Sequence, residues 1–291
     1  MPGPVMVALD GSERDPRALA VAVGLADLAH APLHLVHVID EPSDSEVAQG
    51  AFLGLDRSAV SGRRGVATHL SETASRVSGA TGHPVTFDIP ESGRVIEELV
   101  QRAVLHDASV LVMATRAPSA LELALIGGVT ERVVRESPRP VVVVPPGSAD
   151  MQDRHVRFSR VLVPLDGSAL SGRALELLMS WPGAAALEYV LLEVVPSRGD
   201  TSAAEQRLAA ARDRVRARGA TAVEVRTVES DDAARAICDA VRDDLVDIIA
   251  MTTRGASGLQ RLAVGSVAEG VVKASDVPLL LLTPASLGAA A

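Results

Sequence analysis

The sequence predicts an α/β protein with two similar domains in tandem. Each domain is expected to be an open, doubly wound parallel sheet of five strands with helices on both faces. Three observations support this prediction: a repeat of domain size, short apolar runs that alternate with longer helical stretches, and a turn-rich segment between the two copies. The chain has 291 residues, which is long enough for two domains that each bury a core.

The repeat is visible at two places in the chain. Residues 5–12 (VMVALDGS) return as residues 161–168 (VLVPLDGS), so Asp166 follows Asp10 by 156 positions. Residues 113–117 return as residues 251–255, so Met251 follows Met113 by 138 positions. The difference between the offsets, 156 − 138 = 18 residues, indicates an extra segment in the first copy. We place it in the Ser-, Gly- and Asp-rich region 40–64 and expect a mobile loop over the first site.

Buried parallel strands are predicted where apolar residues follow one another without polar alternation. These runs are 5–9, 33–39, 85–89, 110–114 and 141–144 in the first copy, and 161–165, 189–195, 222–228, 248–251 and 279–282 in the second. Helices are predicted between them at 15–29, 65–78, 94–106 and 129–136, and then at 170–180, 203–218, 231–243 and 267–275. The predicted domains are residues 1–147 and 158–284, joined by a linker of turn formers and charged residues at 145–157.

The composition narrows the class of partner. A net charge of −9 argues against nucleic acid, because binding to its backbone needs Lys and Arg to neutralise phosphates. The apolar runs are far shorter than the roughly 18 residues that predict a membrane span, and we expect no membrane association. The start of the chain shows no basic-then-apolar leader, and the single cysteine, Cys238, fits a reducing compartment. We therefore expect a soluble, cytoplasmic protein.

The candidate binding residues follow strands one and four. In open parallel sheets, ligands bind at the carboxyl ends of the strands where the strand order reverses, and phosphates bind at helix N-termini. Asp166 ends the first strand of the second copy, where a carboxylate can accept hydrogen bonds from an adenine amino group or a ribose hydroxyl, and Ser168 is a candidate helix N-cap. A strand-to-helix turn without any ligand would use the same residues, because Asp and Gly favour turns.

The segment after the fourth strand of the second copy is more specific. Thr252, Thr253, Arg254 and Gly255 are followed by nine residues and then by Gly265-Ser266 at the start of a predicted helix. Glycines allow backbone N–H groups to approach phosphate oxygens, and the helix N-terminus attracts negative charge. A glycine-containing loop with no ligand remains the alternative for this segment taken alone.

With these two motifs in register twice, the chain resembles the universal stress protein family in its tandem form, over nearly its whole length. The resemblance implies a Rossmann-like (adenine nucleotide alpha hydrolase-like) fold. Nucleotide-binding members of that family carry an aspartate after strand one and a Gly-x2-Gly-x9-Gly-Ser/Thr loop after strand four. In this chain Thr252 stands at the first glycine of that pattern, and a Thr with negative φ can still present its N–H.

The resemblance implies a set of nucleotide-binding residues in each copy. They are Pro164, Leu165, Asp166, Val194, Met251, Thr252, Arg254, Gly255, Gly265, Ser266 and Val267 in the second copy, and Leu9, Asp10, Val38 and Gly127 in the first. The first copy departs from the pattern, since Ala114 and Ala117 replace two glycines and Gly128 stands at the Ser/Thr position. We therefore expect the second copy to hold the working site and the first to be weak or vacant.

Other polar residues give weaker signals. His34 and His37 lie three apart on one predicted strand and so point to opposite faces, which excludes a shared metal ion. The acidic pairs Glu97-Glu98 and Asp243-Asp244 are expected on solvated helix faces. Arg116 and Arg254 follow the fourth strands, where each can contact a phosphate or form a surface ion pair. No metal-ligand spacing is present, although nucleotide phosphates commonly bring Mg²⁺.

Three classes of function fit these observations. The leading hypothesis is a stress-associated regulatory protein that binds an adenine nucleotide, ATP first, with cyclic AMP as the alternative ligand. The second is a scaffold that binds an unknown protein partner, with the two domains forming a pseudo-dimer around vestigial pockets. The third is a slow ATPase, for which the sequence offers no positioned base and no lysine at the phosphates. The apolar strands 141–144 and 279–282 are expected to pair with each other at the domain edges, and a homodimer of chains stays open.

Overall fold

The computed structural model describes residues 2–39, 62–92, 94–115, 128–151, 156–198, 200–253, 265–283 and 286. The first half contains the strands β1 (Val5–Ala8), β2 (Leu33–Val36), β3 (Val85–Asp88), β4 (Val110–Ala114) and β5 (Val141–Val144). Its helices are α1 (Asp15–Ala29), α3 (Arg63–Thr81), α4 (Val95–Leu105) and α5 (Gly128–Glu136), followed by the 3-10 helix η1 (Pro146–Met151). The extra segment predicted in the first copy lies outside the described residues over 40–61.

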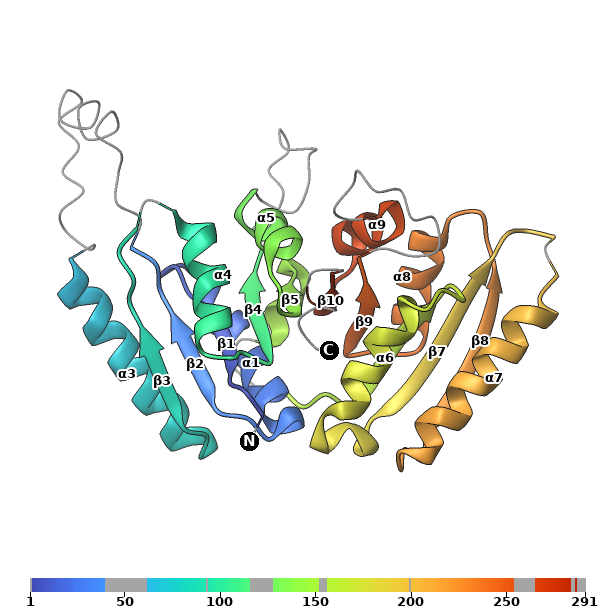
Figure 1. Ribbon diagram of the computed structural model, residues 1–291, viewed down its shortest axis with the longest axis horizontal. Helices are drawn as coiled ribbons and strands as arrows, with labels where there is room; N and C mark the ends of the chain where they lie inside the picture. Colours follow the sequence, from blue (N-terminus) through green and yellow to red (C-terminus); the bar gives the residue numbers. More distant parts are fainter. Residues whose placement is uncertain are drawn as a thin grey trace, which may run out of the picture.

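The second half repeats this order. Its strands are β6 (Arg160–Leu165), β7 (Glu188–Val195), β8 (Val223–Glu229), β9 (Ile248–Thr252) and β10 (Leu279–Leu282). Its helices are α6 (Ser171–Ser180), α7 (Ser202–Ala217), α8 (Ala233–Asp243) and α9 (Ser266–Ala274), with the 3-10 helix η2 (Pro182–Ala186) after α6. Figure 1 shows the two halves as matching units along the long axis of the molecule.

The ten strands form a single sheet with the order β3-β2-β1-β4-β5-β10-β9-β6-β7-β8. Pairing within each half is parallel, as the unbroken apolar runs predict. Each half begins with a central strand, β1 or β6, builds outward over two strands, and then returns to the other side of that first strand. The strand order therefore reverses beside β1 in one half and beside β6 in the other, as in doubly wound sheets.

The two halves join where β5 and β10 pair in antiparallel register, with Val142 opposite Leu280. Every residue of β5 is fully buried, and β10 is at most 2% exposed. The family resemblance implied this pairing, and it satisfies backbone groups that two open apolar edge strands would leave unpaired. The prediction of one sheet per domain is thereby refined to one sheet shared by both halves.

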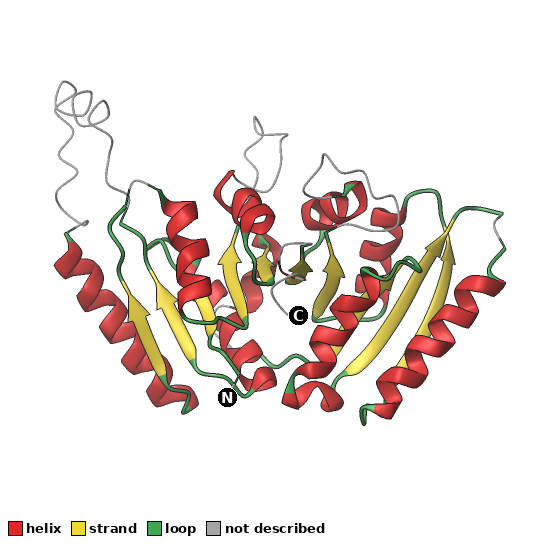
Figure 2. Cartoon of the chain, in the orientation of Figure 1, coloured by secondary structure: helices red, strands yellow, loops and turns green. Residues whose placement is uncertain are grey.

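Helices cover both faces of the shared sheet (Figure 2). On one face α1, α3, α6 and α7 bury apolar side chains against the strands, and on the other face α4, α5, α8 and α9 do so. Alternate residues of each strand supply the two cores: Val5 and Val7 belong to the first, whereas Met6 belongs to the second. Among the described residues, no helix is long and apolar enough to cross a membrane.

The predicted elements are all present in the described part of the chain, and their ends move by at most three residues. Helix α3 runs to Thr81 rather than to the predicted residue 78, because Gly82 at φ +77° forms its left-handed C-cap and donates to the carbonyl of Ser78 at 2.8 Å. Strand β2 ends at Val36 rather than at residue 39, and Ile39 makes only an isolated bridge to Glu91.

The seam between β5 and β10 yields a prediction. Replacing Leu280 with Ala removes a fully buried side chain opposite Val142, and we expect a loss of about 2–5 kcal/mol in the free energy of unfolding. Urea denaturation followed by circular dichroism measures the loss. The control is Leu245→Ala, because Leu245 is 82% exposed. The stability of this variant should stay within about 0.5 kcal/mol of that of the wild type. Equal losses of stability at Leu280 and Leu245 would contradict the stabilising role of the β5–β10 pairing.

Candidate functional site

The turn after β6 holds Asp166 at the start of a hydrogen-bonded bend. Gly167 has φ +76°, and the N–H of Ser168 donates to Asp166 Oδ1 at 3.0 Å. Ser168 Oγ in turn accepts the N–H of Ser171 at 3.1 Å, which is the role expected of an N-cap, although α6 itself begins at Ser171. The Asp166 N–H donates to Ser171 Oγ at 3.3 Å. The turn is therefore held by the Asp166 carboxylate and by the hydroxyl groups of Ser168 and Ser171.

Strand β7 places a buried carboxylate next to this turn. Glu193 pairs in register with Leu165, and its side chain is only 4% exposed. Arg207 of α7 binds both carboxylate oxygens of Glu193, and the hydrogen bond and charge of Glu193 raise the pKa of Arg207. The Arg207 side chain also lies over the turn, since a Cβ added to Gly167 would come within 2.8 Å of its Nε. The half-buried Val194 follows on the same strand.

The fourth strand of the second half ends with two buried residues of the predicted site. Met251 and Thr252 are the last two residues of β9, and their exposed fractions are 6% and 8%. Thr252 thus belongs to a strand and is not among the described residues with positive φ, so its position does not require a glycine. Arg254 and Gly255 lie outside the described residues, as does Gly127 of the first copy.

Helix α9 begins directly after the predicted phosphate loop. Gly265 is its extended N-cap, with φ −73° and ψ 155°, and its N–H donates to the carbonyl of Thr253 at 2.6 Å. Among the described residues no side chain caps this helix, and Ser266 is exposed at its first position, followed by Val267 at 37% exposure. The start of α9 therefore presents a hydroxyl group and uncapped backbone donors.

Strand order brings these segments to one edge of the sheet. Strand β6 lies between β9 and β7, all three are parallel, and the order reverses between β6 and β9. The carboxyl ends that carry Asp166, Val194 and Thr252 consequently lie at the same edge. Pro164 and Leu165 end β6 beneath this edge.

The corresponding turn in the first half carries a second carboxylate besides its strand-end aspartate. Asp15 stands at the position of Ser171, is 7% exposed, and accepts the N–H groups of Asp10 and Gly11 at 3.1 and 2.9 Å. Burial, with the Asp10 charge adding to it, raises the pKa of Asp15 to about 6, even though the backbone hydrogen bonds oppose the shift. Arg14 binds Oδ2 of Asp10.

The remaining predicted residues of the first half follow the same layout. Leu9 is buried after β1, and Val38 is half-buried after β2. His37 stands where the second half has Glu193; its ring lies 3.8 Å from the position of a Cβ on Gly11, and burial lowers its pKa. As expected, His37 does not share a site with His34, which contacts Asp88 and His106 instead.

Three charged residues near these turns, Asp15, Glu193 and Arg207, are not among the site residues predicted from the sequence. Asp15 falls within the predicted helix 15–29, and Glu193 falls within the predicted strand 189–195. The available signal was a glutamate inside the otherwise apolar run 189–195, since a buried carboxylate needs a partner. That partner, Arg207, lies 14 residues further along, and only the packing of α7 on β7 brings it close.

A comparison with family models decides the family. The model of the universal stress protein family matches this chain twice, over residues 1–145 and 157–283. The chain belongs to the universal stress protein family. A universal stress protein of Mycobacterium tuberculosis is 23% identical over 312 aligned positions, which cover 95% of this chain and 94% of the relative.

Solved universal stress proteins share the fold. One from Archaeoglobus fulgidus superposes with a TM-score of 0.68 at 22% identity, covering 95% of this chain and 97% of that one. Another universal stress protein has been solved in complex with cAMP; it is 25% identical, covers 43% of this chain and 96% of its own, and has a TM-score of 0.37.

Asp15 makes the stability of this universal stress protein depend on pH. Its pKa is higher in the folded chain than its ordinary value of 3.8, so the folded state binds more protons across that interval, and stability falls as the pH rises from about 4 to about 6. Replacing Asp15 with Ser, the residue of the second half, removes this effect. From about pH 4.5 to pH 7.5 the free energy of unfolding of the variant should increase by about 2 kcal/mol relative to that of the wild type. Urea denaturation at the two pH values measures the gain, and a difference that does not change with pH would contradict the assignment.

Gly167 gives a second prediction. Replacing it with Ala places a Cβ at φ +76° and against Arg207, and we expect a loss of about 1–2 kcal/mol in the free energy of unfolding. The control is Gly172→Ala in α6, where nothing lies within 4 Å of the added Cβ and helix propensity improves. Thermal unfolding of the two variants should shift in opposite directions, and a similar destabilisation of both would contradict the role of Gly167.

Proposed function

We propose that this universal stress protein is a regulatory protein that binds an adenine nucleotide, ATP in preference to cyclic AMP, chiefly in its second half. The observation that carries the proposal is the reversal of strand order between β6 and β9, which sets the Asp166 turn and the start of α9 on neighbouring parallel strands. In sheets of this kind that edge is where nucleotides bind.

The Asp166 turn supports the adenosine end of the ligand. A carboxylate at this position can accept hydrogen bonds from the adenine amino group or the ribose, and Val194 offers an apolar surface beside it. The guanidinium of Arg207 places positive charge close to Asp166 and offsets the buried charge of Glu193.

The start of α9 supports the phosphate end. Uncapped N–H groups, the helix dipole and the Ser266 hydroxyl group all favour negative charge there. Arg254 and Gly255, which precede α9, complete the predicted phosphate loop, and Mg²⁺ would enter with the phosphates of ATP.

The second half is the better candidate because its first turn carries less negative charge. In the first half the carboxylate of Asp15 occupies the backbone donors of the turn, and Asp10 is engaged by Arg14. In the second half Ser171 serves the same place without charge. A phosphorylated ligand therefore meets weaker repulsion in the second half.

Catalytic phosphoryl transfer is a poorer fit than binding. The only lysine in the sequence, Lys273, lies in the last turn of α9 and binds Glu269 at 2.7 Å. It is thus at the wrong end of the helix to contact phosphates at the N-terminus. A scaffold function is the second candidate, favoured by the charged first turn of the first half.

The proposal is tested by titrating variants of the two aspartates with ATP and with cyclic AMP. Asp166→Ala should weaken ATP binding at least about tenfold, because it removes a charged acceptor, whereas Asp10→Ala should leave the affinity nearly unchanged. Asp166→Asn removes the charge but keeps an oxygen that can accept the Ser168 N–H. It therefore shows whether a loss of affinity comes from the missing charge or from a disrupted turn. Calorimetry gives the affinities, and denaturing the purified protein gives the amount of nucleotide bound per chain.

The outcomes distinguish the candidate functions. Equal losses from the two alanine variants, or about two nucleotides released per chain, would contradict the preference for the second half. No binding of either nucleotide at millimolar concentration would favour the scaffold. Tighter binding of cyclic AMP than of ATP would overturn the choice of ligand but not the position of the site.

A further inference from the structure

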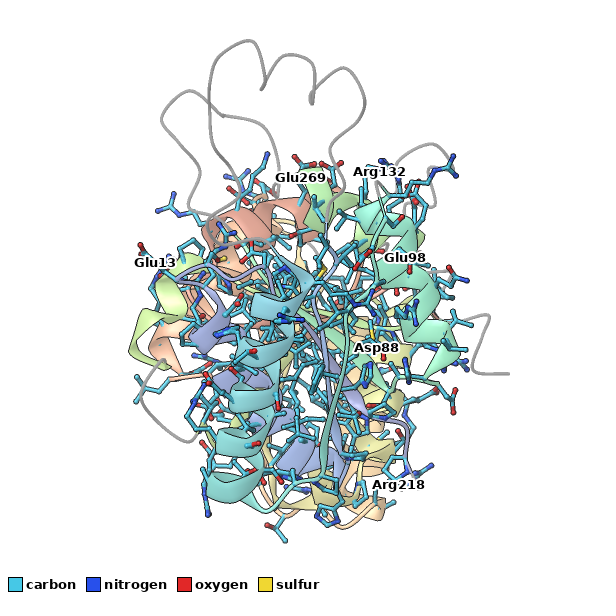
Figure 3. All side chains as sticks on the ribbon, turned by 90° about the vertical axis from the view of Figure 1, so that its left-hand side faces the viewer. Glu13, Asp88, Glu98, Arg132, Arg218 and Glu269 are labelled. Carbon is cyan, nitrogen blue, oxygen red and sulfur yellow. The ribbon has the colours of Figure 1, made fainter. Side chains whose placement is uncertain are left out.

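We propose that His34, Asp88 and His106 form a binding site for a divalent transition-metal ion of the zinc class. The three residues come from β2, the end of β3 and the residue after α4, on the face of the sheet that α4 covers. Their candidate ligand atoms all lie within 4.8 Å of one another. Figure 3 shows the position of Asp88 on this side of the molecule, below Glu98 of α4.

The strongest indication is the unsatisfied nitrogen of His34. The residue is 2% exposed, and among the described residues its buried Nε2 atom has no hydrogen-bond partner. This nitrogen points into the cluster, 3.6 Å from Asp88 Oδ2. A buried polar atom without a partner costs free energy, and a bound ion would satisfy it.

The second ring nitrogen of His34 already has the contact that a metal ligand needs. Its Nδ1 atom lies 2.8 Å from Thr86 Oγ1 on the neighbouring strand. A proton on Nδ1, donated to the Thr86 hydroxyl oxygen, leaves the lone pair of Nε2 facing Asp88. Burial, with the charges of His106 and Arg102 adding to it and that of Asp88 opposing it, lowers the pKa of His34 to about 4.

Metal binding requires His106 to retreat and its ring, which is stacked on that of His34 at an interplanar angle of 31°, to rotate. His106 Nε2 lies 2.7 Å from Asp88 Oδ2, and the rings of His34 and His106 face each other with centroids 3.9 Å apart. Tetrahedral zinc with bonds of about 2.0–2.1 Å separates its ligand atoms by about 3.3 Å. His106 therefore has to retreat by about 0.6 Å, and its side chain, 29% exposed at the end of α4, has room to do so.

Two charges beside the cluster modulate the affinity. Arg102 donates to Asp88 Oδ2 at 3.2 Å and opposes a cation, but it is also bound to Glu98 at 3.4 Å, which can retain it when the ion enters. Burial alone would raise the pKa of Asp88, but the hydrogen bond from His106 and the nearby positive charges lower it, so the carboxylate is ionised and able to bind a metal.

The second half shows what this location looks like without ligand atoms. Strand register places Val190, which is fully buried, where the first half has His34, and Arg226 where it has Asp88. The residue after α8 is Asp244, the counterpart of His106, and it forms an ion pair with Arg226. The same fold thus forms with an apolar side chain and an ion pair at these positions. The buried histidine of the first half is therefore not required for packing.

The test uses the full chain after treatment with EDTA. We expect Co²⁺ to bind as a single equivalent with visible absorption bands of four- or five-coordinate geometry, and Zn²⁺ to displace it. His106→Ala and His34→Val should each weaken binding at least about tenfold, and His34→Val carries the residue that the second half tolerates. Arg102→Gln should tighten binding by about threefold or more, because it removes a positive charge next to the ligands.

His69→Ala, at an exposed histidine of α3, is the matched control and should bind as the wild type does. Circular dichroism of each variant establishes that it is folded. Equal affinities of the wild type and His106→Ala would show an adventitious surface ion only and overturn the proposal. Absence of Co²⁺ and Zn²⁺ binding at millimolar concentration would overturn it as well.

Discussion

The antiparallel pairing of β5 with β10 is the constraint on which the rest of the structure depends. Both strands consist entirely of Val or Leu, and both are buried. Two separate five-stranded sheets would each end in an apolar edge with unpaired N–H and C=O groups, which proteins avoid. Pairing the edges satisfies these groups, merges the two cores along the sheet, and leaves only β3 and β8 at the outside.

The outer strands are suited to that position by their polar residues. Strand β8 has no fully buried residue, and Arg226 and Glu224 on it form ion pairs with each other and with neighbours. Strand β3 carries Thr86 and Asp88, both of which interact with His34. Charged and polar side chains on an edge discourage further strand addition, so the sheet stops at ten strands.

The two halves keep one backbone plan while differing in charge at corresponding places. The first turn is served by Asp15 in one half and by Ser171 in the other. The end of the second strand carries His37 in one and the Glu193–Arg207 pair in the other. The cluster of His34, Asp88 and His106 lies beneath α4 in one half, whereas the Arg226–Asp244 ion pair and the buried Val190 lie beneath α8 in the other. Because the strand order is equivalent in both halves, these differences change local charge and pKa values rather than the fold.

The sequence by itself determined the fold and the strand ends at which the proposed site lies. Unbroken apolar runs separated by helical stretches identify parallel strands, and the repeat places Asp10 and Asp166 at equivalent strand ends. Such features are local, because burial on both faces and turn geometry constrain the residues that stand there.

Only the tertiary structure decided which charged groups meet. His106 follows α4 whereas Asp88 ends β3, and Arg207 lies on α7 whereas Glu193 lies on β7, so no period within one helix or strand relates the partners. The expectation that Asp243 and Asp244 share a solvated face was wrong for Asp244, whose side chain is 11% exposed and paired with Arg226. Helices packed across strands bring these residues together, and the free energy of a charge depends on its surroundings in space rather than on its neighbours in the chain.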